Sequence, residues 1–116
     1  MSQDLIANLE ALLVKGGDSA TLRLALASRY LEAGDATAAA RHAQGAVRID
    51  PEYSAGWRAF GRALAAAGKT AEAQQAYERG IEVAERRGDR QAANEMRVFL
   101  KRLVRAAAAE QKTKED

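Results

Sequence analysis

Cysteine is absent from this chain of 116 residues, and histidine and proline each occur once, as His42 and Pro51. The absence of cysteine excludes disulfide bridges, thiolate nucleophiles and cysteine-ligated metal sites. A single histidine, with no nucleophile and orienting group in a recognisable arrangement, gives no basis for a catalytic triad. No cluster of His, Asp or Glu has the spacing of metal ligands. The sequence therefore predicts neither an enzyme nor a metalloprotein, and we expect His42 to be structural or solvent-facing.

Long apolar runs are also missing. No segment approaches the roughly 20 apolar residues that a membrane-spanning helix needs. The residues from Met1 to Asp4 lack the basic stretch and the apolar run of a secretory signal. We therefore expect no membrane association and a cytoplasmic location, and the length corresponds to one domain, residues 1–116.

Alanine is frequent and proline nearly absent, which together favour helices. Glycine and short polar residues divide the sequence into six predicted helices of about 13–20 residues. The turns between them have about two to four residues, and connections of that length can only join antiparallel neighbours. We expect helices to stop at Gly16, Gly34, Asp50, Gly68 and Gly88, and Asp18 or Ser19, Asp35 and Thr70 to act as N-caps.

An internal repeat appears when the sequence is displaced by 34 residues, because small residues then coincide with small and large with large. Small residues let two helices approach closely, and the large residue beside each fills the space left by the next turn. The coinciding pairs are Leu26 with Phe60, Ala27 with Gly61, Tyr30 with Leu64, Gly34 with Gly68, Ala39 with Ala73, and Ala46 with Gly80.

The second unit, residues 54–87, carries Trp57, Phe60, Gly61, Leu64, Ala73 and Tyr77 at the spacing of a known pattern. In these positions the chain resembles the tetratricopeptide repeat, a helix–turn–helix unit with the pattern W-x2-L-G-x2-Y…A-x3-F…P. The first unit, residues 20–53, keeps Asp50-Pro51 but has Arg23 in place of the tryptophan. The second has Glu85 instead of the closing proline, so its last helix is expected to run on to Arg87.

The resemblance implies an all-α fold, an antiparallel helix-hairpin repeat stack of the α-solenoid type. We expect capping helices at residues 1–17 and 88–109, because the end units of such a stack need one solvated face, and a flexible tail at residues 110–116. Trp57 and Tyr77 occupy packing positions of the pattern and are expected in the core.

The string Gly68-Lys69-Thr70 looks like the end of a phosphate-binding loop, but Ala63 stands where that loop needs glycine. No cofactor is therefore expected.

In proteins that resemble this chain, partners usually lie in a concave groove lined by the first helix of each hairpin. The resemblance therefore implies a scaffold or interaction module that binds a protein or peptide. Arg58 and Arg62 lie one turn apart, so they could hold a carboxylate or a phosphate, or they could be solvated or paired with glutamates. Leu24 and Leu31 could face the groove or be buried against the first helix. The groove positions implied are Thr21, Leu24, Ser28, Leu31, Ala55, Arg58, Arg62 and Ala65.

Members of the family that bind the acidic tails of chaperones carry lysine and asparagine where this chain has Leu24 and Ser28, which argues against binding of such tails.

An alternative function rests on the sixth predicted helix. Between Arg86 and Arg105 there are seven basic residues against two acidic ones, an excess of five positive charges. Arg97, Lys101 and Arg105 recur every four residues as a stripe suited to nucleic acid or another acidic surface, although no aromatic residues interleave with them. The same helix could instead mediate self-association, or it could be a simple solvated cap.

Overall fold

The computed structural model describes residues 2–115, and these form six α-helices joined by short turns. The helices are α1 (Ser2–Val14), α2 (Ala20–Glu32), α3 (Ala36–Ile49), α4 (Ser54–Ala66), α5 (Thr70–Arg86) and α6 (Arg90–Glu115). The described residues contain no strand, so the predicted all-α class is confirmed. The limits predicted for the domain, Met1 and Asp116, lie outside the described residues.

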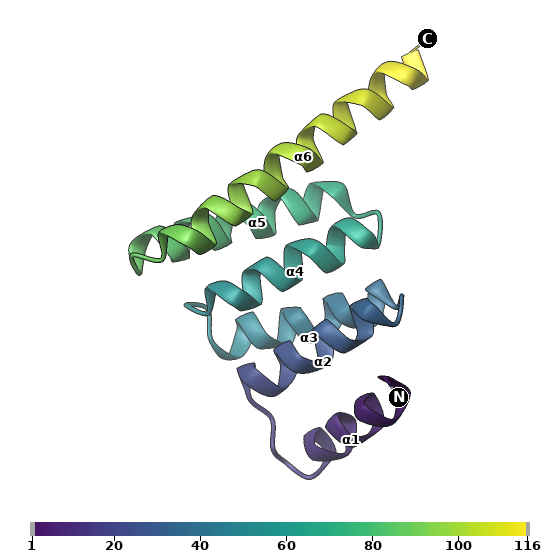
Figure 1. Ribbon diagram of the computed structural model, residues 1–116, viewed down its shortest axis with the longest axis vertical. Helices are drawn as coiled ribbons and strands as arrows, with labels where there is room; N and C mark the ends of the chain where they lie inside the picture. The colour runs from purple at the N-terminus through teal and green to yellow at the C-terminus, as the bar shows by residue number, and fades with distance from the viewer. Residues whose placement is uncertain (1, 116) are drawn as a thin grey trace.

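The helices stack in chain order from the N-terminal end to the C-terminal end of an elongated molecule measuring 52 × 33 × 20 Å (Figure 1). Two hairpins form the centre of the stack, α2 with α3 and α4 with α5, and α3 packs on α4 to join them. Helix α2 also contacts α4, and α4 contacts α6, so these three helices form one row and α3 and α5 form another. This two-row arrangement is the helix-hairpin repeat stack that the internal repeat predicts.

Four of the turns are closed in the same way, because a glycine with positive φ follows the helix in each. Gly16, Gly34, Gly68 and Gly88 have φ of 90°, 85°, 79° and 76°, a conformation that side chains with a Cβ rarely adopt. In each turn the next residue donates its N–H to a carbonyl in the last helical turn, as Asp35 does to Tyr30 at 2.9 Å. The chain therefore reverses at the positions predicted from glycine.

Two of the predicted N-caps are confirmed and one is wrong. Ser19 Oγ accepts from Leu22 N at 3.0 Å, and Asp35 Oδ1 accepts from Ala38 N at 3.1 Å. Thr70 is instead the first residue of α5, after Lys69 at the N-cap, and no side chain caps this helix. The tight glycine turn leaves one residue between Gly68 and the helix, and that residue is Lys69.

The core depends on small residues at helix crossings. A Cβ added to Gly61 of α4 would lie 2.5 Å from the ring of Tyr77 in α5, and one added to Gly80 of α5 would lie 2.5 Å from Met96 Sδ in α6. Tyr77 is 3% exposed and Met96 is fully buried. Trp57 is partly buried against both clusters of this core, as expected for a packing position. Neither crossing therefore leaves room for a Cβ at its glycine.

The C-terminal helix is longer than predicted. The polar composition after Ala109 indicated an end there, but α6 continues to Glu115 and spans 26 residues, against 17 for α5. Alanine, glutamate, glutamine and lysine all favour helix, and no glycine or proline follows Ala109 to stop it. Figure 1 shows the last turns of α6, drawn in yellow, extending beyond the end of α5. Helix α5 itself ends at Arg86, with Arg87 as its C-cap, one residue short of the predicted end.

Replacing Gly61 by alanine should lower the free energy of unfolding by about 1–3 kcal/mol, because the new methyl group must displace the buried Tyr77 ring. Urea unfolding followed by circular dichroism measures the change. Gly45→Ala in α3 is the matched control, since the nearest atoms there, at 3.2–3.3 Å, belong to the end of the Arg23 side chain. An equal loss in both variants would contradict the proposed role of the α4–α5 contact.

Candidate binding surfaces

A hollow of about 280 Å³ lies between α2 and α4, in the row that also contains α6. We call it the α2–α4 hollow. Its lining comes from four residues of α2 and two of α4, one turn or less apart along each helix. These residues are Ala27, Ser28, Leu31, Glu32, Ala59 and Arg62.

Three residues singled out from the sequence line this hollow: Ser28, Leu31 and Arg62. Thr21 is exposed on the first turn of α2, and Leu24 is half-buried, but neither lines the hollow. Glu32 was not singled out from the sequence, although it follows Leu31 directly and lies one turn after Ser28. Its carboxylate accepts from Arg29 at 3.1 Å, so it is already paired with a cation.

Arg58 and Arg62 have different surroundings, although they lie one turn apart on α4. Arg58 Nη1 donates to Glu95 Oε2 of α6 at 2.7 Å, which is the glutamate pairing considered from the sequence. Arg62 makes no ion pair among the described residues, and its guanidinium lies 5.9 Å from the centre of the Phe99 ring. The two arginines therefore do not form a common clamp, and Arg62 is the available cation at the hollow.

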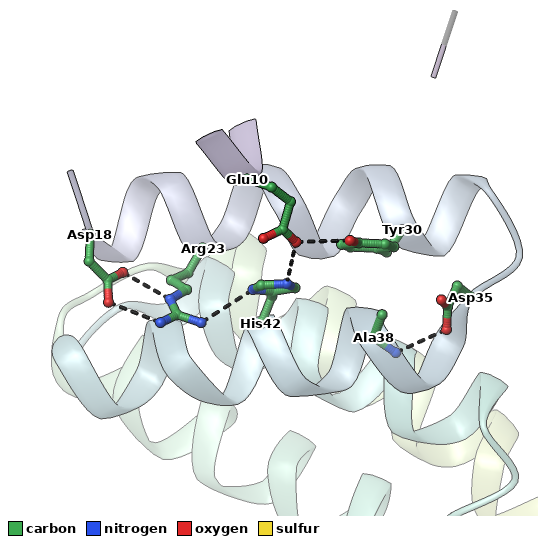
Figure 2. Close-up of polar contacts among 7 residues, drawn as sticks. All are labelled: Glu10, Asp18, Arg23, Tyr30, Asp35, Ala38 and His42. Carbon is green, nitrogen blue, oxygen red and sulfur yellow. Dashed lines mark hydrogen bonds and ion pairs between the residues drawn. The ribbon is translucent and has the colours of Figure 1, made fainter. Parts of the chain in front are cut away.

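A second polar group, shown in Figure 2, joins α1 to the first hairpin. Glu10 Oε1 of α1 accepts from the Tyr30 hydroxyl at 2.8 Å and lies 3.1 Å from His42 Nε2. Arg23 Nη1 lies 3.3 Å from His42 Nδ1, and the same guanidinium donates twice to Asp18, at 2.8 and 3.0 Å. The Tyr30 and His42 rings stack, with centroids 5.4 Å apart.

The hydrogen bonds identify the protonation state of His42. A guanidinium only donates, so Nδ1 must accept from Arg23, and the proton of a neutral imidazole is then on Nε2, facing Glu10. His42 is 3% exposed, and its burial lowers the pKa of the imidazole, with the positive charges of Arg23 and Arg41 acting in the same direction and Glu10 against it. His42 is therefore a buried structural residue, one of the two roles expected for it.

The basic stripe of α6 is exposed, but its three residues are not equivalent. Arg97 Nη2 lies 2.6 Å from Glu85 Oε1 of α5, so its charge is partly neutralised. Lys101 and Arg105 are exposed and make no ion pair among residues 4–114. All three line a shallow hollow of about 410 Å³ together with Leu100 and Val104.

Comparison with known proteins agrees with the hairpin stack. The family model described as the tetratricopeptide repeat matches residues 30–96, more than half of the chain. The chain belongs to the tetratricopeptide repeat (TPR) family. The match begins near the end of α2 and ends in α6, so it includes α3, α4 and α5 in full.

The relatives of this TPR chain support the same fold along nearly its whole length. A TPR repeat-containing protein of Pseudomonas aeruginosa is 52% identical over 102 residues, which are 88% of this chain and 97% of the relative. A protein of Bordetella parapertussis of known solution structure is 40% identical, with a TM-score of 0.78 over 92% of this chain and 93% of its own. A TPR domain protein of Salinibacter ruber is 26% identical, with a TM-score of 0.67 over 74% and 87%.

TPR domains are generally modules of protein–protein interaction. Within residues 2–115, no helix is both long enough and apolar enough to cross a membrane. The same residues contain no group of three side chains that could hold a metal ion. Two surfaces at which a partner can be sought are the α2–α4 hollow and the exposed face of α6.

The stability of the TPR stack should depend on pH through His42. In the unfolded chain its imidazole takes up a proton near its ordinary pKa of about 6.5, whereas in the folded chain the pKa is lower. The unfolded state then binds more protons, so the free energy of unfolding should fall as pH decreases from about 6.5 towards the folded pKa. Urea unfolding at pH values between about 7.5 and 5 measures this.

His42→Gln is the control for this pH dependence, because the amide does not titrate and its N–H can still donate to Glu10. Its unfolding free energy should vary less over the same range than that of the original chain. Parallel curves for the two proteins would show that His42 does not cause the loss.

Proposed function

We propose that this TPR chain is a non-catalytic scaffold that binds a peptide or protein segment in the α2–α4 hollow. The observation that carries the proposal is that Ser28 and Leu31 of one hairpin and Arg62 of the next line the same hollow. A ligand there would contact both repeats at once. The absence of cysteine fits a cytoplasmic setting, in which disulfides do not form.

The side chains of the hollow define the chemistry of the segment that it would accept. Leu31 and Ala59 offer apolar surface, and Arg62 offers a guanidinium that can bind a carboxylate through two parallel hydrogen bonds. Glu32 is paired with Arg29 and would still repel a second acidic group nearby. A volume of about 280 Å³ suits one or two side chains of a peptide. We therefore propose a segment that presents one apolar side chain with one carboxylate beside it.

Nucleic-acid binding through the stripe of Arg97, Lys101 and Arg105 is a weaker alternative. Arg97 is paired with Glu85, which leaves fewer free charges for phosphates. Valines lie among the basic residues of this face, where single-strand binding would favour aromatic rings.

Binding of a segment in the α2–α4 hollow can be tested by photo-crosslinking, because the chain has no cysteine of its own. Ser28→Cys places a single thiol in the hollow for a benzophenone maleimide label, and Gln74→Cys places the same label on the exposed surface of α5. Irradiation in lysate of the host cell should give a discrete adduct with the label at Ser28 and none with the label at Gln74. The same adduct from both positions, or from neither, would argue against the hollow as the binding site.

Arg62→Glu in the Ser28→Cys chain tests the proposed carboxylate anchor. The reversed charge should reduce the adduct at least about tenfold, since an attractive contact is replaced by a repulsive one. Arg48→Glu, on the exposed end of α3, is the matched control and should leave the yield unchanged. Adduct yields that do not differ between the two variants would remove Arg62 from the site.

A further inference from the structure

The face of α6 that points away from α4 is uncovered. Glu95 and Phe99 contact α4 through the ion pair with Arg58 and the ring contact with Arg62. Val104 lies nine residues after Glu95, which at about 100° per residue puts it on the opposite side of the helix. Helix α6 contacts α4 and α5, and no other element within residues 2–115 covers its remaining face. Figure 1 shows α6 at one edge of the stack.

Apolar residues are present on this uncovered face. Val104 is 45% exposed, and Leu100 is half-buried, with part of its side chain packed against the core. Leu100 and Val104 lie one turn apart, and Ala107 continues the alternating spacing of three and four residues. This is the spacing with which one helix packs along another. We call Arg97, Leu100, Lys101, Val104 and Arg105, which line the hollow of about 410 Å³, the outer face of α6.

Basic residues flank these apolar positions and no acidic residue accompanies them. Between Arg97 and Ala109 the chain has four basic residues and no acidic one. Lys101, Arg102 and Arg105 make no ion pair among the described residues, and only Arg97 has a carboxylate beside it. In a helix pair, charged residues beside the apolar seam select the partner by their sign. The charges on the outer face of α6 therefore favour an acidic partner.

We propose that the outer face of α6 docks an amphipathic helix of another protein whose apolar stripe is flanked by glutamate and aspartate. Leu100 and Val104 of α6 would pack against the apolar stripe of that helix. Lys101 and Arg105 would pair with its acidic flanks. This surface is separate from the α2–α4 hollow, so a partner on α6 leaves the hollow accessible.

The charge pattern disfavours two other occupants. A second copy of the chain would bring four basic residues against the same four, with no acidic residue in this segment to compensate. A nucleic acid would satisfy the basic side chains but would leave Val104 against phosphate and water. An acidic amphipathic helix satisfies both the charges and the apolar surface.

The test uses the whole chain and a designed probe. The probe is a fluorescein-labelled helical peptide of three heptads with leucine at the a and d positions and glutamate at e and g, and its control has lysine at e and g. Fluorescence anisotropy should show saturable binding of the glutamate peptide that weakens as salt concentration rises. The lysine peptide should not bind. Equal binding of both peptides would overturn the proposal.

Variants of α6 locate the site. The double variant Lys101→Glu, Arg105→Glu should weaken binding of the glutamate peptide at least about tenfold, and Val104→Ala should weaken it about threefold. Arg48→Glu on α3 is the matched charge control and should bind as the original chain does. Arg62→Glu should also bind the glutamate peptide normally, so failure of this proposal can be distinguished from failure of the proposed binding in the α2–α4 hollow. Unchanged affinity in the double variant, with helicity retained, would overturn the proposal.

Two further measurements identify a different occupant if one exists. Stronger binding of a duplex oligonucleotide than of the glutamate peptide, insensitive to Val104→Ala, would assign the face to nucleic acid and overturn the proposal. Sedimentation that shows a dimer abolished by the double variant would assign the face to a second copy and also overturn it. A monomer that prefers the glutamate peptide supports it.

Discussion

The close approach of helices at glycine and alanine is the constraint on which the packing of this chain rests. At Gly61 and Gly80 no room exists for even a methyl group, because Tyr77, Met96 and Trp57 already occupy the space. Ala39, Ala43 and Ala46 are fully buried in α3 for the same reason. Dispersion and burial of apolar surface stabilise this close contact only if the residues that face the small ones are large. This explains the alternation of small and large side chains along each helix. The two rows of helices, and the hollow between α2 and α4, follow from that spacing.

The N-terminal end of the stack is held in a different way. Helix α1 contacts α2 less extensively than the other neighbours contact each other, and several of its apolar residues remain exposed, Val14 at 85%. Its attachment includes Glu10, which accepts from Tyr30 and His42 across the interface. Buried polar groups are costly unless every donor and acceptor is satisfied, and here the chain from Asp18 through Arg23 to His42 and Glu10 satisfies them. A polar contact of this kind specifies where α1 sits and makes its docking sensitive to protonation.

Electrostatics also separates the two candidate surfaces. The ion pair of Arg58 with Glu95 and the contact of Arg62 with Phe99 connect α4 to α6 on one side of the last helix. The positive charges of Lys101 and Arg105 are left on the other side. One helix therefore has a face used for folding and a face that remains available, and the available face carries the unpaired charges of Lys101 and Arg105.

The number of helices, most of their limits, the repeat and the packing roles of Trp57 and Tyr77 could all be predicted from the residues, because glycine turns and side-chain size act locally and recur at a fixed interval. Ser28, Leu31 and Arg62 could be indicated through the family resemblance. The end of α6 was predicted wrongly from its polar composition, since the helix propensity of those same polar residues carries the helix on.

Other features exist only once the hairpins have stacked. The pairing of Arg58 with Glu95, the place of Glu32 in the hollow and the burial of His42 between Glu10 and Arg23 belong to this class. The hydrogen-bonded pairs among them join residues 19–37 positions apart along the chain. Which side chains meet over such separations is set by the relative position of whole helices, and no local pattern of residues specifies that position.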